Sequence, residues 1–290
     1  MSVTACRGTQ LRCRTWRAEA LLRLLENVLE VGERPEELVV YASIGKAVKD
    51  WDAYRQITDA LRRLGEDQTL VLQTGRPVAV LNTHAAAPMV VSAVNNTVGN
   101  WATEERFYSR LAEHKTIWGG LTAAAWQYIG RQGVLGGTYE LLRAALDRHF
   151  QETTAPHRWV LTAGLGGMGS SQPISARMLQ LSTLTVEADP TKLSRLHAAG
   201  GLDLVLDDLS EALAAVTTAT AKRRAVAVGL LGNAAEIFPA IAASEALPDI
   251  VTDQTAAHDA RYGYLPAGYT LETWTSARER DPGRVERDAR

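Results

Sequence analysis

A glycine-rich segment at residues 164–169 has the residue types and spacing that best fit a chemical task. Gly164, Gly166 and Gly169 satisfy the pattern G-x-G-x-x-G, and Gly167 adds a fourth glycine. Glycines so spaced allow a tight turn after a strand, a close approach of the backbone to a pyrophosphate, and close packing of the next helix. Amide N–H groups at the start of that helix then hold the pyrophosphate. The segment predicts a dinucleotide-binding loop.

The residues around this loop support the prediction. An apolar run at 159–162 precedes the glycines, and a helix-like stretch at 173–181 follows them. Glu187 comes 18 residues after Gly169, at the end of the next apolar run. An acid in this place accepts hydrogen bonds from a ribose diol and repels a 2′-phosphate, which favours NAD over NADP. The alternative, a structural glycine turn followed by a surface acid, stays open.

Two polar segments follow later apolar runs of the same part of the chain. Residues 232–236 (Gly-Asn-Ala-Ala-Glu) come after the run at 226–231, and residues 253–259 come after the run at 250–252. Ligands of open α/β sheets bind at the carboxyl ends of the strands, so both segments are candidate parts of one site. His258 lies between polar neighbours and is a candidate general acid or base, although a single loop histidine is more often only solvated.

The order of predicted elements gives the fold class. Five short apolar runs alternate with helix-like stretches from about residue 135 onward, which predicts βαβ units and a parallel sheet. We therefore expect an α/β protein with a Rossmann-like NAD-binding domain at 135–270. A mixed α/β core segment at 1–134, incomplete by itself, precedes it. A charged C-terminal helix at 271–290, with nothing to pack against, follows it.

The composition excludes several classes of protein. The net charge is −2, and basic residues are spread along the chain, so nothing indicates a nucleic-acid partner. No stretch reaches the ~20 apolar residues that a membrane span needs. The two cysteines, Cys6 and Cys13, match no zinc spacing, and we expect no metal site. Scarce cysteines also suit a reducing cytoplasm, where we expect the protein to reside.

Several sequence blocks together resemble one family. They lie at 37–41, 128–133, 137–140, 161–169, 229–236, 249–259 and 263–268. Their order over nearly the whole chain resembles that in the N-terminal half of urocanase (urocanate hydratase).

The resemblance implies a tightly held NAD that acts as an electrophile rather than as a hydride carrier, while water adds to urocanate and gives imidazolone propionate in histidine degradation. The family's NAD contacts would fall here on Gly167, Met168, Gly169, Glu187, Asn233, Ala234, Gln254, Thr255, Ala256, Ala257, His258, Tyr264 and Leu265. Lys192 stands where the family usually has an arginine, and Tyr41 and Thr122 would lie near the small, imidazole-containing substrate. No catalytic residue is assigned beyond the candidates Tyr41, Thr122 and His258.

The sequence also departs from the family pattern. Ala42 and Ser43 replace a Gly-Gly pair, and Gly120 replaces a glutamine. The resemblance implies a second core half that supplies a cysteine; these 290 residues contain no block that resembles it, and neither Cys6 nor Cys13 matches its motif. We therefore expect a homo-oligomer or a partner chain that supplies the missing half. Two alternatives stay open: a repurposed or degenerate NAD-binding protein without hydratase activity, and an ordinary NAD dehydrogenase.

Overall fold

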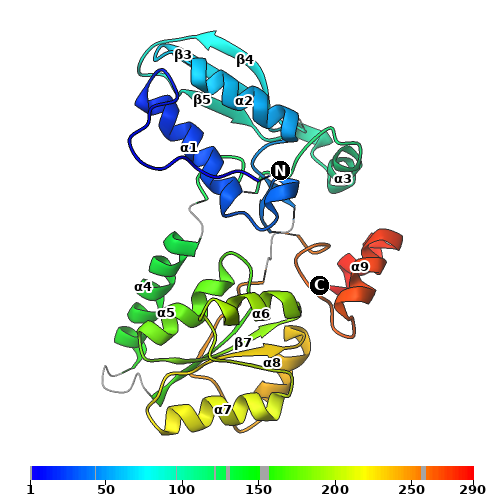
Figure 1. Cartoon of the computed structure of the whole chain (residues 1–290). Helices are drawn as coiled ribbons and strands as arrows, with labels where there is room; N and C mark the ends of the chain where they lie inside the picture. Colours follow the sequence, from blue (N-terminus) through cyan, green and yellow to red (C-terminus); the bar gives the residue numbers. More distant parts are fainter. Residues whose placement is uncertain are drawn as a thin grey trace. The chain divides into compact units, whose positions relative to one another are not determined.

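The computed structural model describes residues 2–42, 44–95, 97–120, 122–128, 131–150, 157–255 and 259–290. The chain forms two compact units, Met1–Gly130 and Arg131–Arg290 (Figure 1). Both combine helices with strands, so the predicted α/β class is confirmed. No helix among the described residues has the length and apolar character to cross a membrane.

The first unit packs two helices against a small mixed sheet. Helix α1 (Trp16–Glu30) begins at Thr15, whose side chain accepts a hydrogen bond from the Ala18 N–H, and α2 (Trp51–Arg63) begins at Asp50 in the same way. Strand β3 (Gln68–Gln73) lies between antiparallel β4 (Arg76–Asn82) and parallel β5 (Val90–Ala93). Apolar side chains of both helices and β3 form the core, among them Leu22, Leu25, Ile57, Leu61, Leu70 and Leu72.

Shorter elements complete this unit. Strands β1 (Val39–Tyr41) and β2 (Gly45–Lys46) pair antiparallel. One-turn 3₁₀ helices lie at Pro35–Glu37 and Gly99–Trp101, and α3 covers Glu104–Ala112. Tyr41 is the last residue of β1 and lies opposite Gly45 of β2.

Residues 2–14, here called the N-terminal strap, are held on α1 by buried ion pairs. Glu19 is 0% exposed and accepts from Arg12 Nε at 3.0 Å and from Arg23 Nε at 2.8 Å. Arg12 Nη1 also contacts Glu26 at 2.7 Å. Burial by itself raises the pKa of Glu19, but the hydrogen bonds from Arg23, the Arg12 N–H and the Arg12 guanidinium outweigh it and lower that pKa to about 2. The strap is thus fixed by charge rather than by secondary structure.

The second unit contains the predicted five-stranded parallel sheet. Its order is β10-β6-β7-β9-β8, and every adjacent pair is parallel. The strands are β6 (Trp159–Ala163), β7 (Ser182–Glu187), β8 (Leu204–Leu206), β9 (Ala227–Leu231) and β10 (Ile250–Val251). All residues of β6 and β7 are buried, as expected for central strands covered on both faces. Their buried residues include hydroxyl side chains, Thr162 in β6 and Thr183 and Thr185 in β7, beside the apolar ones.

Helices cover both faces of this sheet (Figure 1). On one face α4 (Arg131–His149), α5 (Gln172–Met178) and α6 (Pro190–Ala198) contribute to two apolar clusters, and on the other α7 (Leu209–Ala221) and α8 (Ala234–Ala242) contribute to a third. The first two turns of helix α4 contain Gly133, Gly136 and Gly137. A glycine inside a helix costs about 1 kcal/mol relative to alanine, so these turns depend on tertiary contacts.

The C-terminal segment differs from the expected single, unpacked helix. It forms two helices, α9 (Leu271–Arg280) and α10 (Pro282–Asp288), which contact each other. Trp274 and Val285 are buried, and Arg261 forms an ion pair with Glu286. Pro282 explains the break, because a proline cannot continue a helix but fits the first position of a new one, here with Asp281 as the N-cap.

The sheet face below α5 and α6 carries a row of threonines that leads to a testable prediction. Within the described part of the chain, the buried hydroxyls of Thr183 and Thr185 have no hydrogen-bond partner. A buried unpaired hydroxyl costs about 1–3 kcal/mol, and valine has the same shape without this cost. We expect Thr185→Val to raise the free energy of unfolding by about 1 kcal/mol and Tm by about 3 °C in thermal denaturation.

The matched control is Thr162, which pairs with Thr185 across the sheet. Its hydroxyl accepts from Thr252 Oγ1 at 2.8 Å, so Thr162→Val removes a hydrogen bond and should lower Tm. Equal changes for the two variants would show that the pairing of the hydroxyl does not decide the outcome.

Candidate functional site

The glycine loop begins where β6 ends. Gly164 has φ of +85°, and its N–H donates to the Val186 carbonyl at 2.9 Å. A Cβ added at Gly164 would lie 2.9 Å from the carbonyl carbon and oxygen of Gln254. Both the left-handed backbone and the close approach of this neighbouring segment therefore require glycine at the turn.

The other two glycines of the pattern have different surroundings. A Cβ added at Gly169 would lie 1.8 Å from the Gly164 carbonyl oxygen, so the end of the loop packs directly on its beginning. Gly166, in contrast, has no heavy atom of the described residues within 4 Å of such a Cβ. Met168 beside it is exposed. The loop thus closes tightly at its ends and leaves the backbone of its middle open to a ligand.

Glu187 ends β7 beside this loop and is only 7% exposed. One carboxylate oxygen accepts from the Leu165 N–H at 2.6 Å, and the other accepts from the Asp189 N–H at 3.0 Å. Lys192 Nζ lies 3.8 Å from the first of these oxygens. The sequence predicted an acid for a ribose diol, whereas the structure adds a second task that spacing does not reveal: Glu187 tethers the glycine loop. Each oxygen keeps a further lone pair for a ligand.

Two further segments lie at the carboxyl edge of the sheet, and the first of them contacts the loop. The Gln254 N–H donates to the Ala163 carbonyl at 2.8 Å, which places Gln254 and Thr255 beside Gly164. Asn233 follows β9 and caps α8, with its Oδ1 accepting from the Ala235 N–H at 3.0 Å. Ala234 is the first residue of that helix. The predicted residues Ala256, Ala257 and His258 lie outside the described residues.

The segment containing Tyr264 and Leu265 is held near α8 by Asn233, whose Nδ2 donates to the Pro266 carbonyl at 2.9 Å. Tyr264 is half-buried, and burial, with a smaller contribution from the charge of Asp253, raises the pKa of its phenol. The phenol therefore keeps its proton at neutral pH and can donate a hydrogen bond.

The substrate-side candidates, Tyr41 and Thr122, lie in the first unit and contact each other. Tyr41 Oη accepts from the Thr122 N–H at 3.1 Å, and the Tyr41 ring lies 5.2 Å from that of Tyr128. Gly120 has φ of +56°, and a Cβ there would lie 2.7 Å from Tyr41 Oη. A glutamine, as the urocanase pattern has here, would require Tyr41 to move. The change to Gly120 is therefore coupled to the position of Tyr41.

Ala42, which stands where the family pattern has a glycine, has a backbone conformation that favours glycine. Its φ is +53°, in the left-handed region, which costs an alanine about 1–2 kcal/mol. The backbone at this position therefore suits the glycine of the family pattern better than the alanine that stands here.

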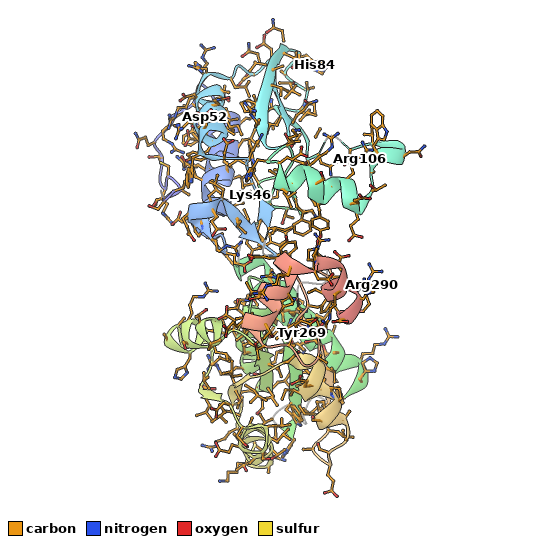
Figure 2. All side chains as sticks on the ribbon, turned by 90° about the vertical axis from the view of Figure 1, so that its right-hand side faces the viewer. Lys46, Asp52, His84, Arg106, Tyr269 and Arg290 are labelled. Atoms are coloured by element: carbon orange, nitrogen blue, oxygen red, sulfur yellow. The ribbon has the colours of Figure 1, made fainter. Side chains whose placement is uncertain are left out.

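The cysteine and histidine of this unit considered next do not add to the candidate site. Burial, followed by the nearby Glu19 carboxylate, raises the pKa of the Cys13 thiol to about 11, so the thiol is protonated and unreactive at neutral pH. His84 is exposed in the loop after β4, at the opposite end of the first unit from Lys46 (Figure 2). Among the residues that the structure describes, no group of three or more His, Cys, Asp or Glu could hold a metal.

Comparison with protein-family models adds an independent observation to this geometry. Residues 3–127 match the model of the urocanase N-terminal domain, and residues 130–290 match that of the urocanase Rossmann-like domain. The first match falls within the first compact unit, and the second covers the unit that carries the glycine loop. With both matches in this order, covering nearly its whole length, the chain belongs to the urocanase family.

Proposed function

We propose that the second unit binds NAD and that the chain serves a urocanate hydratase-like lyase. The observation that carries the proposal is the glycine loop, with its ends closed by Gly164 and Gly169 and its middle open at Gly166. Family membership supports the reaction class, since both urocanase domains match in order.

The residues of the loop fit a dinucleotide pyrophosphate. Within the described residues, the N–H groups of Gly166, Gly167 and Met168 donate to no protein acceptor, and the loop leads into α5 through a turn of 3₁₀ helix. Unpaired N–H groups before a helix attract an anion. Glu187 would accept from the ribose hydroxyls through its remaining lone pairs, with Lys192 limiting the negative charge there. The donor set therefore suits NAD.

When bound, NAD supplies an electron-accepting ring to the reaction. The residues of this chain hold and orient the cofactor, and Tyr264 can donate a hydrogen bond at the same edge. Hydration of urocanate adds one water to the conjugated imidazole propenoate and gives imidazolone propionate. It changes no net oxidation state, which distinguishes it from dehydrogenase chemistry.

The test is native mass spectrometry of the purified chain, followed by denaturing release of any ligand and by a urocanate assay. We expect one NAD per chain. In the assay, the ultraviolet absorption of urocanate should decrease without formation of NADH. Formation of NADH with an alcohol substrate would favour a dehydrogenase instead. Bound NAD without consumption of urocanate would favour a repurposed NAD-binding protein, and a chain that takes up no NAD would overturn the proposal.

The same spectra report the state of association. We propose that the chain works as a homo-oligomer or with a partner chain, and a strictly monomeric, fully active chain would contradict this.

A further inference from the structure

The first turn of α8 holds a distant tight turn from both sides. Asn233 Nδ2 donates to the Pro266 carbonyl at 2.9 Å, and Glu236 Oε1 accepts from the Gly268 N–H at 2.8 Å. These contacts join residues 33 and 32 positions apart. We call the two contacts the α8 clamp. One helical turn thus fixes both a donor and an acceptor of the same short backbone segment.

The clamped segment is a turn with a defined shape. The Tyr269 N–H donates to the Pro266 carbonyl at 3.2 Å, and Gly268, the third residue of the turn, has φ of +79°. Such a positive φ at the third position favours glycine, as in type II turns. Tyr269 then contacts Asp288 of α10, with its hydroxyl donating to the Asp288 carboxylate at 2.7 Å. The position of this turn therefore sets the path of the chain on either side of it.

The contact that Glu236 makes is not the one that its position in α8 predicts. An acid at the third helical position usually reaches back to the backbone N–H of the N-cap residue. Glu236 occupies that position in α8, but its carboxylate contacts Gly268 instead. Its side chain is exposed, so no packing in the core requires it. What the carboxylate does is hold the turn.

We propose that Glu236, together with Asn233, is a positioning residue for the dinucleotide of this unit. It holds the turn at 266–269 against the start of α8. In this way it keeps Tyr264 and Leu265 near the carboxyl end of β9, at the edge of the sheet where the glycine loop lies. The inference rests on the proposed function, because it takes NAD as the ligand that these two residues meet. Glu236 acts through the turn and does not itself contact the cofactor.

The experiment compares Glu236→Ala, Glu236→Gln and Glu211→Ala in the full chain. Glu211 is the matched control: it is an exposed acid at the third position of α7, where it holds no distant turn among the described residues. The readouts are the NAD dissociation constant by calorimetry, amide hydrogen exchange of a peptide spanning 264–270 without NAD, and Tm.

We expect Glu236→Ala to weaken NAD binding about fivefold, as for one net hydrogen bond. Exchange in 264–270 should accelerate about tenfold, since the turn loses its acceptor. Glu236→Gln should stay near the wild type, because its amide oxygen can accept the same hydrogen bond. Glu211→Ala should change neither quantity. It should lower Tm less than Glu236→Ala does, since both variants lose an acid from a first helical turn but only Glu236→Ala also loses the hydrogen bond to Gly268.

Three results would overturn the inference. Wild-type exchange in Glu236→Ala would mean that the contact does not hold the turn. Faster exchange with unchanged NAD affinity would mean that the turn does not position the cofactor. A wild-type chain that binds no NAD would remove the proposed function and the positioning role together, while the exchange data would still report whether the α8 clamp exists.

Discussion

Gly169→Ala is expected to weaken NAD binding at least about 100-fold, which corresponds to ~3 kcal/mol. The added methyl group would lie 1.8 Å from the Gly164 carbonyl oxygen and 2.6 Å from its carbon. Both are backbone atoms, so the loop itself has to move. Movement at Gly164 also disturbs Gln254, which lies against it. Calorimetric titration with NAD measures the loss.

Two alanine variants separate this effect from a general loss of stability. Gly166→Ala places its methyl group in open space, so Tm should stay near the wild type while NAD binding weakens, because the methyl group covers the backbone that the pyrophosphate approaches. Gly136→Ala, in open space on α4, should leave NAD binding unchanged and stabilise the helix by up to ~1 kcal/mol. Wild-type affinity in Gly169→Ala would contradict the assignment of this loop as the NAD site.

Glu19→Gln is expected to lower the free energy of unfolding of the first unit by about 3 kcal/mol, because it breaks a buried ion-pair network and leaves Arg12 and Arg23 short of a charge partner. Urea denaturation measures the change. The control is Glu37→Gln, whose ion pair with Arg34 lies on the surface, with the Glu37 side chain 56% exposed. Such a pair contributes less than about 1 kcal/mol. Similar losses in both variants would contradict the special role of Glu19.

The dependence of stability on pH follows from the same carboxyl group. Its pKa is about 2 in the folded chain, below the ordinary value of 4.5 that applies on unfolding. The contribution of the Glu19 carboxylate to the free energy of unfolding is therefore fully present above pH 4.5. It is lost as the pH falls from there toward 2. The wild type should lose stability more steeply than Glu19→Gln over this range, as measured by urea denaturation at a series of pH values.

The sequence alone determined the features that depend on local pattern. The strand-like runs at β6, β7 and β9, which alternate with helix-like stretches, predict a parallel sheet, because βαβ units place parallel strands side by side. The glycine spacing from Gly164 to Gly169 predicts the loop, because a tight turn and close backbone contacts of this kind need residues without a Cβ. Glu187 was found by its distance from the loop, since adjacent parallel strands end at the same edge.

Only the tertiary structure decided which side chains meet across long separations. The tether from Glu187 to the Leu165 N–H, the hold of Glu236 on Gly268, and the contact of Tyr41 with Thr122 join residues that no periodic pattern relates. The sequence analysis expected one helix at 271–290 and found neither the break at Pro282 nor the packing of α9 on α10. Such contacts depend on the direction of each side chain and on the path of the backbone, and both are fixed only when the whole unit packs.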